Sequence, residues 1–266
     1  MPDPAFLAAY AALGLAVGFV AGLLGVGGGL IIVPVLIALL QVQGLAAGME
    51  PQVALGTSLA SILFTSLSSV RAHHRHGAVE WPLLRRITPG IVAGTLAGAL
   101  LAAQLPGQVL KLFFVAFLFY AATQMWLDFK PQPHRALPGN AGTTFAGGVI
   151  GAVSSWVGIG GGTLSVPFML WHNIPLHRAI GTSAAIGFPI ALAGALGYVV
   201  GGWRSEGLPD ASLGYVYLPA LAGIVLGSVL TAPLGARTAH RLPVRPLKRI
   251  FAVLLYVLAV RMLTTL

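Results

Sequence analysis

Long apolar segments separated by short polar stretches make up almost the whole chain of 266 residues. Uncharged apolar runs of about 18 or more residues recur, which is the length needed to cross a hydrocarbon core about 30 Å thick. We therefore expect an all-α, polytopic membrane protein without a soluble second domain. The pattern predicts apolar segments at residues 5–24, 29–41, 53–70, 87–104, 108–127, 141–158, 162–172, 179–200, 212–233 and 246–264.

Two of these segments, 29–41 and 162–172, are too short for a full perpendicular span, and each directly follows a run of glycines. The first run lies in "GVGGGLIIVP" at 25–34 and the second in "GIGGGTLSVP" at 158–167. A glycine inside a helix costs about 1 kcal/mol relative to alanine, so a triple interruption needs a reason. We expect each short segment to be a half-helix or a re-entrant piece that begins at a glycine break.

The chain contains an internal repeat. The two glycine-rich stretches match at a shift of 133 residues, and "ALGTSLA" at 54–60 matches "AIGTSAA" at 179–185 at a shift of 125. A further match joins "LKLFF" at 110–114 with "LKRIF" at 247–251. The matches follow the same order in both halves, which predicts a duplication with an N-terminal membrane repeat at 1–135 and a C-terminal membrane repeat at 136–266.

Charge predicts the orientation of the segments. Only 8% of the residues are charged, and Lys and Arg outnumber Asp and Glu by 15 to 6. By the positive-inside rule, the Arg-rich loops are cytoplasmic: 71–86, 128–135 and 234–249. Arg204 is the only basic residue in the loops assigned to the outside, which are 42–52, 105–107 and 201–211. Each half then makes an odd number of passes, which predicts an inverted-topology repeat of two five-segment halves with broken or re-entrant helices, as in many secondary transporters.

Several classes of chemistry are disfavoured by residues that are missing or misplaced. The chain has no cysteine, so disulfides and thiolate metal sites are excluded. The acidic residues all fall in loops or at segment ends, whereas a proton or sodium pump usually carries a carboxylate inside the membrane. The histidines also lie in loops. We expect no catalytic residue, no cofactor and no enzymatic activity.

The glycine breaks are the strongest candidates for a binding site. Unpaired N–H and C=O groups are costly in hydrocarbon, so an interrupted helix needs a cavity or a protein partner around it. A half-helix that begins there presents free N–H groups and its positive dipole end, which suit an anion. Close helix packing is the alternative explanation of the glycines. Because both halves repeat the break with a proline five residues later, we favour the anion site.

Hydroxyl side chains accompany both breaks. Gly56–Thr57–Ser58 and Gly181–Thr182–Ser183 could donate to an oxyanion or could cap backbone groups. The second break has additional polar neighbours, Ser154, Ser155, Thr163 and Ser165, so we expect the closer ligand contact there. Trp156 is either a wall of the site or a packing residue. The predicted substrate-binding residues are Gly27, Gly28, Gly29, Thr57, Ser58, Trp156, Gly160, Gly161, Gly162, Thr163, Thr182 and Ser183.

Three further groups of residues have weaker interpretations. His73, His74 and His76 could suggest a metal, but Arg71 and Arg75 alternate with them and repel cations, so no metal site is predicted. The hydroxyls of Thr57, Ser61, Thr65 and Ser68 share one helical face, which suits either a water-lined path or interhelical hydrogen bonds. Lys111 and Lys248 occupy equivalent places in the two halves, where they could attract an anion or snorkel to the interface.

The duplicated G-x-G-G-G-x4-P element, followed in each half by Gly-Thr-Ser, resembles the TauE/SafE family of sulfite and organosulfonate exporters over essentially the whole chain. The resemblance implies a multi-pass transporter of the bacterial inner membrane that exports small sulfur-containing anions. Its expected partners are a small anionic substrate and the lipid bilayer, with a homodimer possible and no nucleic acid. The alternatives are a divalent-metal transporter and a non-transporting membrane assembly protein.

Overall fold

The computed structural model of the chain describes residues 3–24, 28–45, 48–128, 136–239 and 244–265. Within these ranges the chain forms ten helices and one two-stranded sheet, which confirms the all-α class. The elements are α1 (Pro4–Leu24), α2 (Gly29–Val42), α3 (Glu50–Arg75), α4 (Trp81–Ala102), α5 (Gly107–Leu127), α6 (Asn140–Val157), α7 (Gly162–Trp171), α8 (Leu176–Gly201), β1 (Ser212–Leu213), β2 (Val216–Tyr217), α9 (Leu218–Ala239) and α10 (Val244–Leu263).

Each predicted apolar segment corresponds to one helix, with ends that agree to within six residues. The prediction was wrong at 212–217, which was assigned to a span. These residues instead form a β-hairpin in which Ser212 lies opposite Tyr217. Gly214 in its turn has a φ of +54°, a conformation that reverses the chain and that glycine adopts without strain. The span therefore begins only at Leu218.

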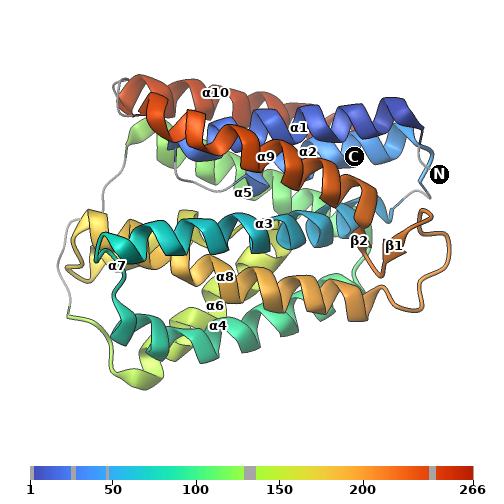
Figure 1. The fold of residues 1–266 in the computed structure, drawn as a ribbon. Helices are drawn as coiled ribbons and strands as arrows, with labels where there is room; N and C mark the ends of the chain where they lie inside the picture. The colour runs from blue at the N-terminus through green and yellow to red at the C-terminus, as the bar shows by residue number, and fades with distance from the viewer. Residues whose placement is uncertain (1–2, 25–27, 46–47, 129–135, 240–243, 266) are drawn as a thin grey trace.

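The helices lie side by side along one common direction, and both chain ends and the β-hairpin lie at the same end of the bundle (Figure 1). Among the described residues, five helices are long and apolar enough to cross a membrane by length and composition: α1, α3, α5, α8 and α9. The helices α2 and α7 are apolar but too short to do so. The chain is therefore a multi-pass membrane protein, as predicted.

The two halves are inverted relative to each other, because equivalent helices run antiparallel. A Cβ atom built on Gly56, near the start of α3, would lie 2.9 Å from the Cβ of Tyr198, near the end of α8. A Cβ built on Gly187, nearer the start of α8, would lie 3.7 Å from the Cβ of Ser66, farther along α3. The equivalent pair α5 and α10 is antiparallel too, since Asp128 after α5 pairs with a lysine in the first turns of α10.

The repeats interlock through glycine contacts. The first helix of each half packs in parallel on the fourth helix of the other half, as the pairs α1–α9 and α4–α6. A Cβ built on Gly94 would lie only 2.0 Å from the carbonyl oxygen of Gly148, and one built on Gly14 only 2.5 Å from that of Ile224. Small residues allow such close backbone approach between membrane helices. Each half thus completes its packing only with helices of the other.

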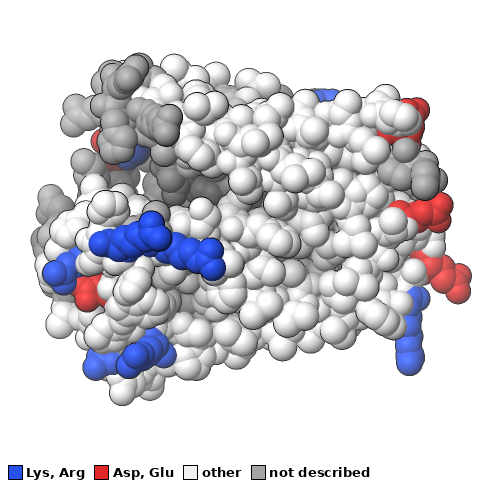
Figure 2. Space-filling view, in the orientation of Figure 1, with Lys and Arg blue, Asp and Glu red and all other residues white. Residues whose placement is uncertain are grey.

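The charged side chains separate to the two ends of the bundle. Figure 2 shows Lys and Arg mostly at the end opposite the β-hairpin, whereas most Asp and Glu on this face gather at the hairpin end. The basic end is the cytoplasmic one by the positive-inside rule. We call the other end the external end.

The α4–α6 contact gives a matched test. Gly94→Ala should lower the stability by about 1–3 kcal/mol, because the new methyl group overlaps the backbone of α6. The melting temperature of the purified protein in detergent measures the effect.

Gly148→Ala is the control, since its Cβ would meet only the carbonyl oxygen of Gly90 at 3.7 Å, an ordinary contact. Equal melting temperatures for the two variants would contradict the interlocking contact.

Candidate functional site

The helix α2 is re-entrant: it begins inside the bundle and returns to the external end. A Cβ built on Gly28, its N-cap, would lie 2.2 Å from Cγ1 of Val17 in the second half of α1. At its other end, Gln43 lines a cavity together with Asp3, which precedes α1. The predicted site residue Gly27 belongs to 25–27, outside the described residues.

The second break has the mirrored arrangement. The helix α6 ends at Gly158, with a φ of +66°, and α7 begins at Gly161, with a φ of +81°. Glycine adopts these conformations without a steric penalty. Because α6 runs parallel to α4 toward the external end, α7 leads back to the cytoplasmic end, where α8 begins.

The two breaks are in direct contact with each other. A Cβ built on Gly29 would lie 2.1 Å from the carbonyl oxygen of Gly158. Ser58 donates its hydroxyl to the same oxygen at 2.8 Å, and all of these atoms are buried. The Gly158 carbonyl is therefore satisfied by the opposite repeat, which explains how a helix can end inside an apolar bundle.

The N-terminus of α7 carries several free N–H groups. Its first two intrahelical hydrogen bonds run from Leu164 and Ser165 to the carbonyl oxygen of Gly161, at 3.0 and 2.7 Å. In the part of the chain that the structure describes, the N–H groups of Gly160, Gly161, Gly162 and Thr163 donate no hydrogen bond.

Buried hydroxyls lie in the first turn of α7, on its neighbour α8 and in the last turn of α6. Ser165 donates to Ser183 at 2.9 Å, and both side chains are buried. The hydroxyls of Thr163 and Ser154 are also buried, and neither has a hydrogen-bond partner among the described atoms. Leaving a buried hydroxyl unsatisfied costs about 1–3 kcal/mol, so this is an expensive arrangement in the unliganded protein. The second break, together with Ser154, Thr163, Ser165 and Ser183, is the candidate site.

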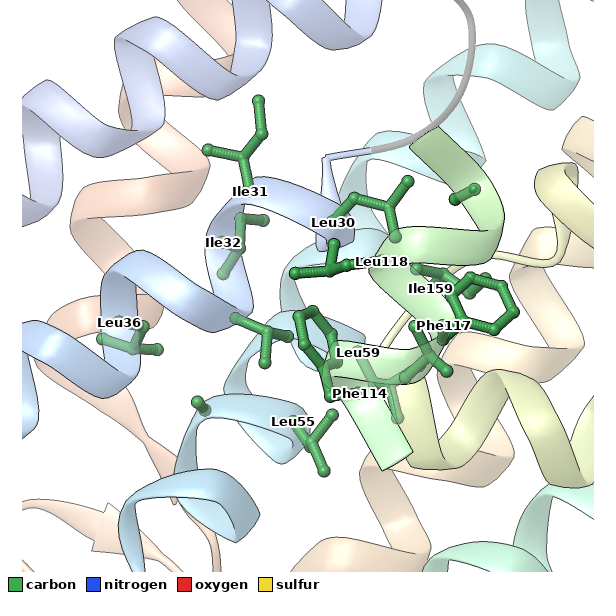
Figure 3. Close-up of a cluster of buried hydrophobic side chains, with 14 of the residues drawn as sticks. Leu30, Ile31, Ile32, Leu36, Leu55, Leu59, Phe114, Phe117, Leu118 and Ile159 are labelled. Carbon is green, nitrogen blue, oxygen red and sulfur yellow. The ribbon is translucent and has the colours of Figure 1, made fainter. Parts of the chain in front are cut away.

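The first break is apolar by comparison. Where α7 has Thr163 and Ser165, α2 has Leu30 and Ile32, and both are fully or almost fully buried. They belong to a cluster with side chains of α3 and α5 and with Ile159 of the second break (Figure 3). The second break is therefore the more polar of the two, and a closer ligand contact there stays a prediction.

The Gly-Thr pairs bind backbone across the repeats. Thr57 accepts the N–H of Tyr217 at 3.0 Å, and Gly56 lies against the backbone of Tyr215; we call this the external latch. The hairpin residue Tyr217 has a pKa raised above its ordinary value by burial, so its phenol stays neutral.

The equivalent contact lies at the other end. Thr182 accepts the N–H of Glu80 at 2.9 Å, and Gly181 lies against Ala78; we call this the cytoplasmic latch. An ion pair between Arg178 and Glu80 reinforces it. Both threonines thus fill the capping role that the sequence left open, and each holds the segment just before the fourth helix of the opposite repeat. The latch partners were missed from the sequence, because the predicted segments 87–104 and 212–233 did not place Glu80 and Tyr217 just before a helix.

Trp156 and the histidine cluster contact residues outside the candidate site. Trp156 donates its indole N–H to the carbonyl oxygen of Gly98 at 2.9 Å and packs edge-on against Phe113. His74 accepts the indole N–H of Trp81 at 3.3 Å. In the described ranges, no group of three or more potential metal-ligating side chains comes together.

Comparisons with known proteins assign the chain to one family of membrane transporters. Residues 10–262 match the family described as Sulfite exporter TauE/SafE. A "Probable membrane transporter protein" of Haemophilus influenzae is 38% identical over 251 residues, 94% of this chain and 95% of the relative. YunE of Bacillus subtilis, with the same description, is 31% identical over 71% of this chain and 77% of its own length. A relative in Methanocaldococcus jannaschii is 24% identical over 94% of this chain and 93% of its own length. No solved structure matches.

The latches predict a pair of matched stability effects. Thr57→Val and Thr182→Val should each lower the stability by about 1–3 kcal/mol, because a buried N–H group loses its acceptor. Exchange of the Tyr217 and Glu80 amide hydrogens should accelerate in the respective variants, which hydrogen–deuterium exchange with mass spectrometry measures.

Thr57→Ser and Thr182→Ser retain the acceptor and serve as controls. Unchanged amide exchange in both valine variants would show that the latches contribute nothing to holding these segments.

Proposed function

The chain belongs to the sulfite exporter TauE/SafE family, and from this premise we propose that it exports small sulfur-containing anions, either sulfite or organosulfonates, across the cytoplasmic membrane. It is a membrane transporter and not an enzyme. In the proposal, the anion binds at the N-terminus of α7, beside the second glycine break, and the two repeats move around it in alternating access.

The observation that carries the proposal is the group of donors without acceptors at this N-terminus. Four successive N–H groups, from Gly160 to Thr163, and the hydroxyls of Thr163 and Ser154 have no described protein partner. An oxyanion offers several acceptor lone pairs, and the positive end of the helix dipole favours its charge. Such a ligand would satisfy groups that are otherwise costly to bury.

The site consists of neutral donors. The sequence from Asn140 to Trp171, which forms α6, the second break and α7, contains no ionisable side chain. A transporter must bind its substrate firmly enough to select it and weakly enough to release it. Amide and hydroxyl donors suit that compromise, because they stabilise a negative charge without a fixed positive charge that would hold the anion.

The membrane potential supplies a driving force for export. A potential of 100 mV, negative inside, favours exit of each negative charge by about 2.3 kcal/mol. All six acidic residues of the chain lie in loops or at helix ends, so no carboxylate sits within a span to carry a coupled proton. We therefore propose potential-assisted uniport as the mechanism.

The two latches fit an alternating-access cycle. The external latch and the cytoplasmic latch both join α3 or α8 to the opposite repeat, at opposite ends of the bundle. A rocking motion of one repeat against the other can release one latch and keep the other. In the proposal, release of the cytoplasmic latch admits the anion, and release of the external latch lets it leave.

Binding is tested with two hydroxyl deletions. Thr163→Val and Ser154→Ala should leave the stability of the unliganded protein unchanged or slightly higher, because the lost hydroxyls have no partner. Each should weaken anion binding by about tenfold, the loss expected for one hydrogen bond to a charged group. The rise in melting temperature during titration with sulfite or methanesulfonate measures the affinity.

Thr88→Val is the control. Thr88 lies in α4, away from the candidate site, and its hydroxyl donates to the carbonyl oxygen of Leu84 in the same helix. Absence of any shift in the wild-type protein with either anion would contradict the proposed function. Equal shifts in the wild type and both variants would place the anion elsewhere.

The voltage dependence of transport is tested in reconstituted vesicles. Anion efflux should rise when a potassium–valinomycin gradient makes the side in contact with the cytoplasmic end negative, because the field then drives the anion outward. A proton ionophore should leave that efflux unchanged. Efflux that ignores the imposed potential and follows a pH gradient would refute uniport.

A further inference from the structure

The cytoplasmic half of α3 carries a groove on one exposed face. Its volume is about 370 Å³, and its lining residues follow a helical spacing of three to four residues: Phe64, Leu67, Ser68, Arg71 and Arg75. Phe64 and Leu67 are about half exposed, and the two arginines are exposed beyond them, toward the cytoplasmic end. The groove thus has a half-exposed apolar part along α3 and a cationic part nearer the cytoplasmic end.

The two arginines have no protein counter-charge. Two of the six acidic residues of the chain lie at this end of the bundle, and both are already paired, Glu80 with Arg178 and Asp128 with Lys248. The side chains of Arg71 and Arg75 make no hydrogen bond or ion pair within the described part of the chain. Their guanidinium groups are therefore free to bind an anion.

The fold itself does not require polar residues at these positions. At the shift of 125 that aligns the Gly-Thr-Ser elements, the equivalent residues of α8 are all apolar: Pro189, Leu192, Ala193, Leu196 and Val200. The positive-inside rule accounts for basic residues at the cytoplasmic end, but it does not require them to line a hollow together with a serine. The combination of apolar, hydroxyl and basic residues that lines the groove is therefore not repeated at the equivalent positions of α8.

The groove lies close to the candidate site along the same helix. A Cβ built on Gly160 of the second break would lie 3.2 Å from Cγ2 of Ile62 in α3. Ile62 is only two residues before Phe64, on a different face of the helix. The apolar end of the groove therefore lies at nearly the depth of the break, and its two arginines lie 9 and 13 residues beyond Ile62, about 14–20 Å farther toward the cytoplasmic end.

We propose that this groove is a cytoplasmic reception site for organic anions, and the proposal rests on the export function proposed above. Arg71 and Arg75 bind the oxyanion head, since planar guanidinium groups match the geometry of paired anionic oxygens. Ser68 adds a hydroxyl donor, and Phe64 with Leu67 contacts the carbon chain. The chemistry selects a compact oxyanion head joined to a short apolar tail, and the groove concentrates such solutes beside the translocation site.

The test uses inside-out vesicles, in which the cytoplasmic end faces the medium, and measures sulfite uptake with alkanesulfonates of increasing chain length as competitors. The double variant Arg71→Gln with Arg75→Gln should raise the KM for sulfite and the inhibition constants by about tenfold, with the maximal rate retained. Phe64→Ala should remove the advantage of butanesulfonate over methanesulfonate and leave the KM for sulfite unchanged.

Arg85→Gln with Arg86→Gln is the matched control, because it removes the same charge from exposed positions at the cytoplasmic end of α4, outside the groove. Equal kinetics for the two double variants would overturn the reception site while leaving export intact. Absence of uptake by the wild-type protein would instead overturn the export function.

The lipid composition separates a dissolved anion from a lipid head group. All measurements are repeated in vesicles of neutral phosphatidylcholine and in vesicles that also contain phosphatidylglycerol. If the groove binds a dissolved anion, the Arg71/Arg75 double variant has a higher KM than the wild type in both kinds of vesicle. A difference that appears only with phosphatidylglycerol would assign the groove to an anionic lipid and would overturn the proposal.

Discussion

The structure depends on one constraint: a backbone N–H or C=O group within hydrocarbon must find a partner inside the protein or in water. Two helices that end within the bundle violate it unless something compensates. Here the compensation comes from the opposite repeat, because Ser58 of one half satisfies the carbonyl of Gly158 in the other. The breaks are consequently bound to each other, and at the start of α7 the N–H groups and the Thr163 hydroxyl still have no acceptor among the described residues.

Duplication explains why the molecule contains these contacts twice, and divergence explains why the copies differ. The Gly-Thr element makes the same contact in both repeats: it joins α3 or α8 to the segment just before the fourth helix of the other repeat. The half-helices do not remain equivalent. After its first glycine, α2 continues with leucine and isoleucine and packs in an apolar cluster, whereas α7 has threonine and then serine in its first turn. A two-fold plan can therefore support a single polar site.

Much of this architecture was predictable because membrane helices are long, uniform and bounded by charge. The segments, the short half-helices and the inversion all followed from hydropathy, glycine runs and arginine positions. The hairpin at 212–217 was missed because it continues into the apolar run of α9 without a charged residue between them, and the turn at Gly214 is the local signal that separates the two. At the candidate site, residue types indicated the polar break, but the partners of Thr57 and Thr182 are distant in sequence and needed the fold. The binding role of the glycines is still a prediction.

The interlocked packing has a consequence for how the chain is made. The helix α1 lies against α9, yet 193 residues separate the end of one from the start of the other. At a synthesis rate of about 5–20 residues per second, α1 waits roughly 10–40 seconds in the bilayer before its neighbour leaves the ribosome. Its glycine-lined face must meanwhile be covered by lipid or by the insertion machinery. The bundle therefore completes its packing late, when helices of both halves are present, and is not assembled from two halves that are already folded.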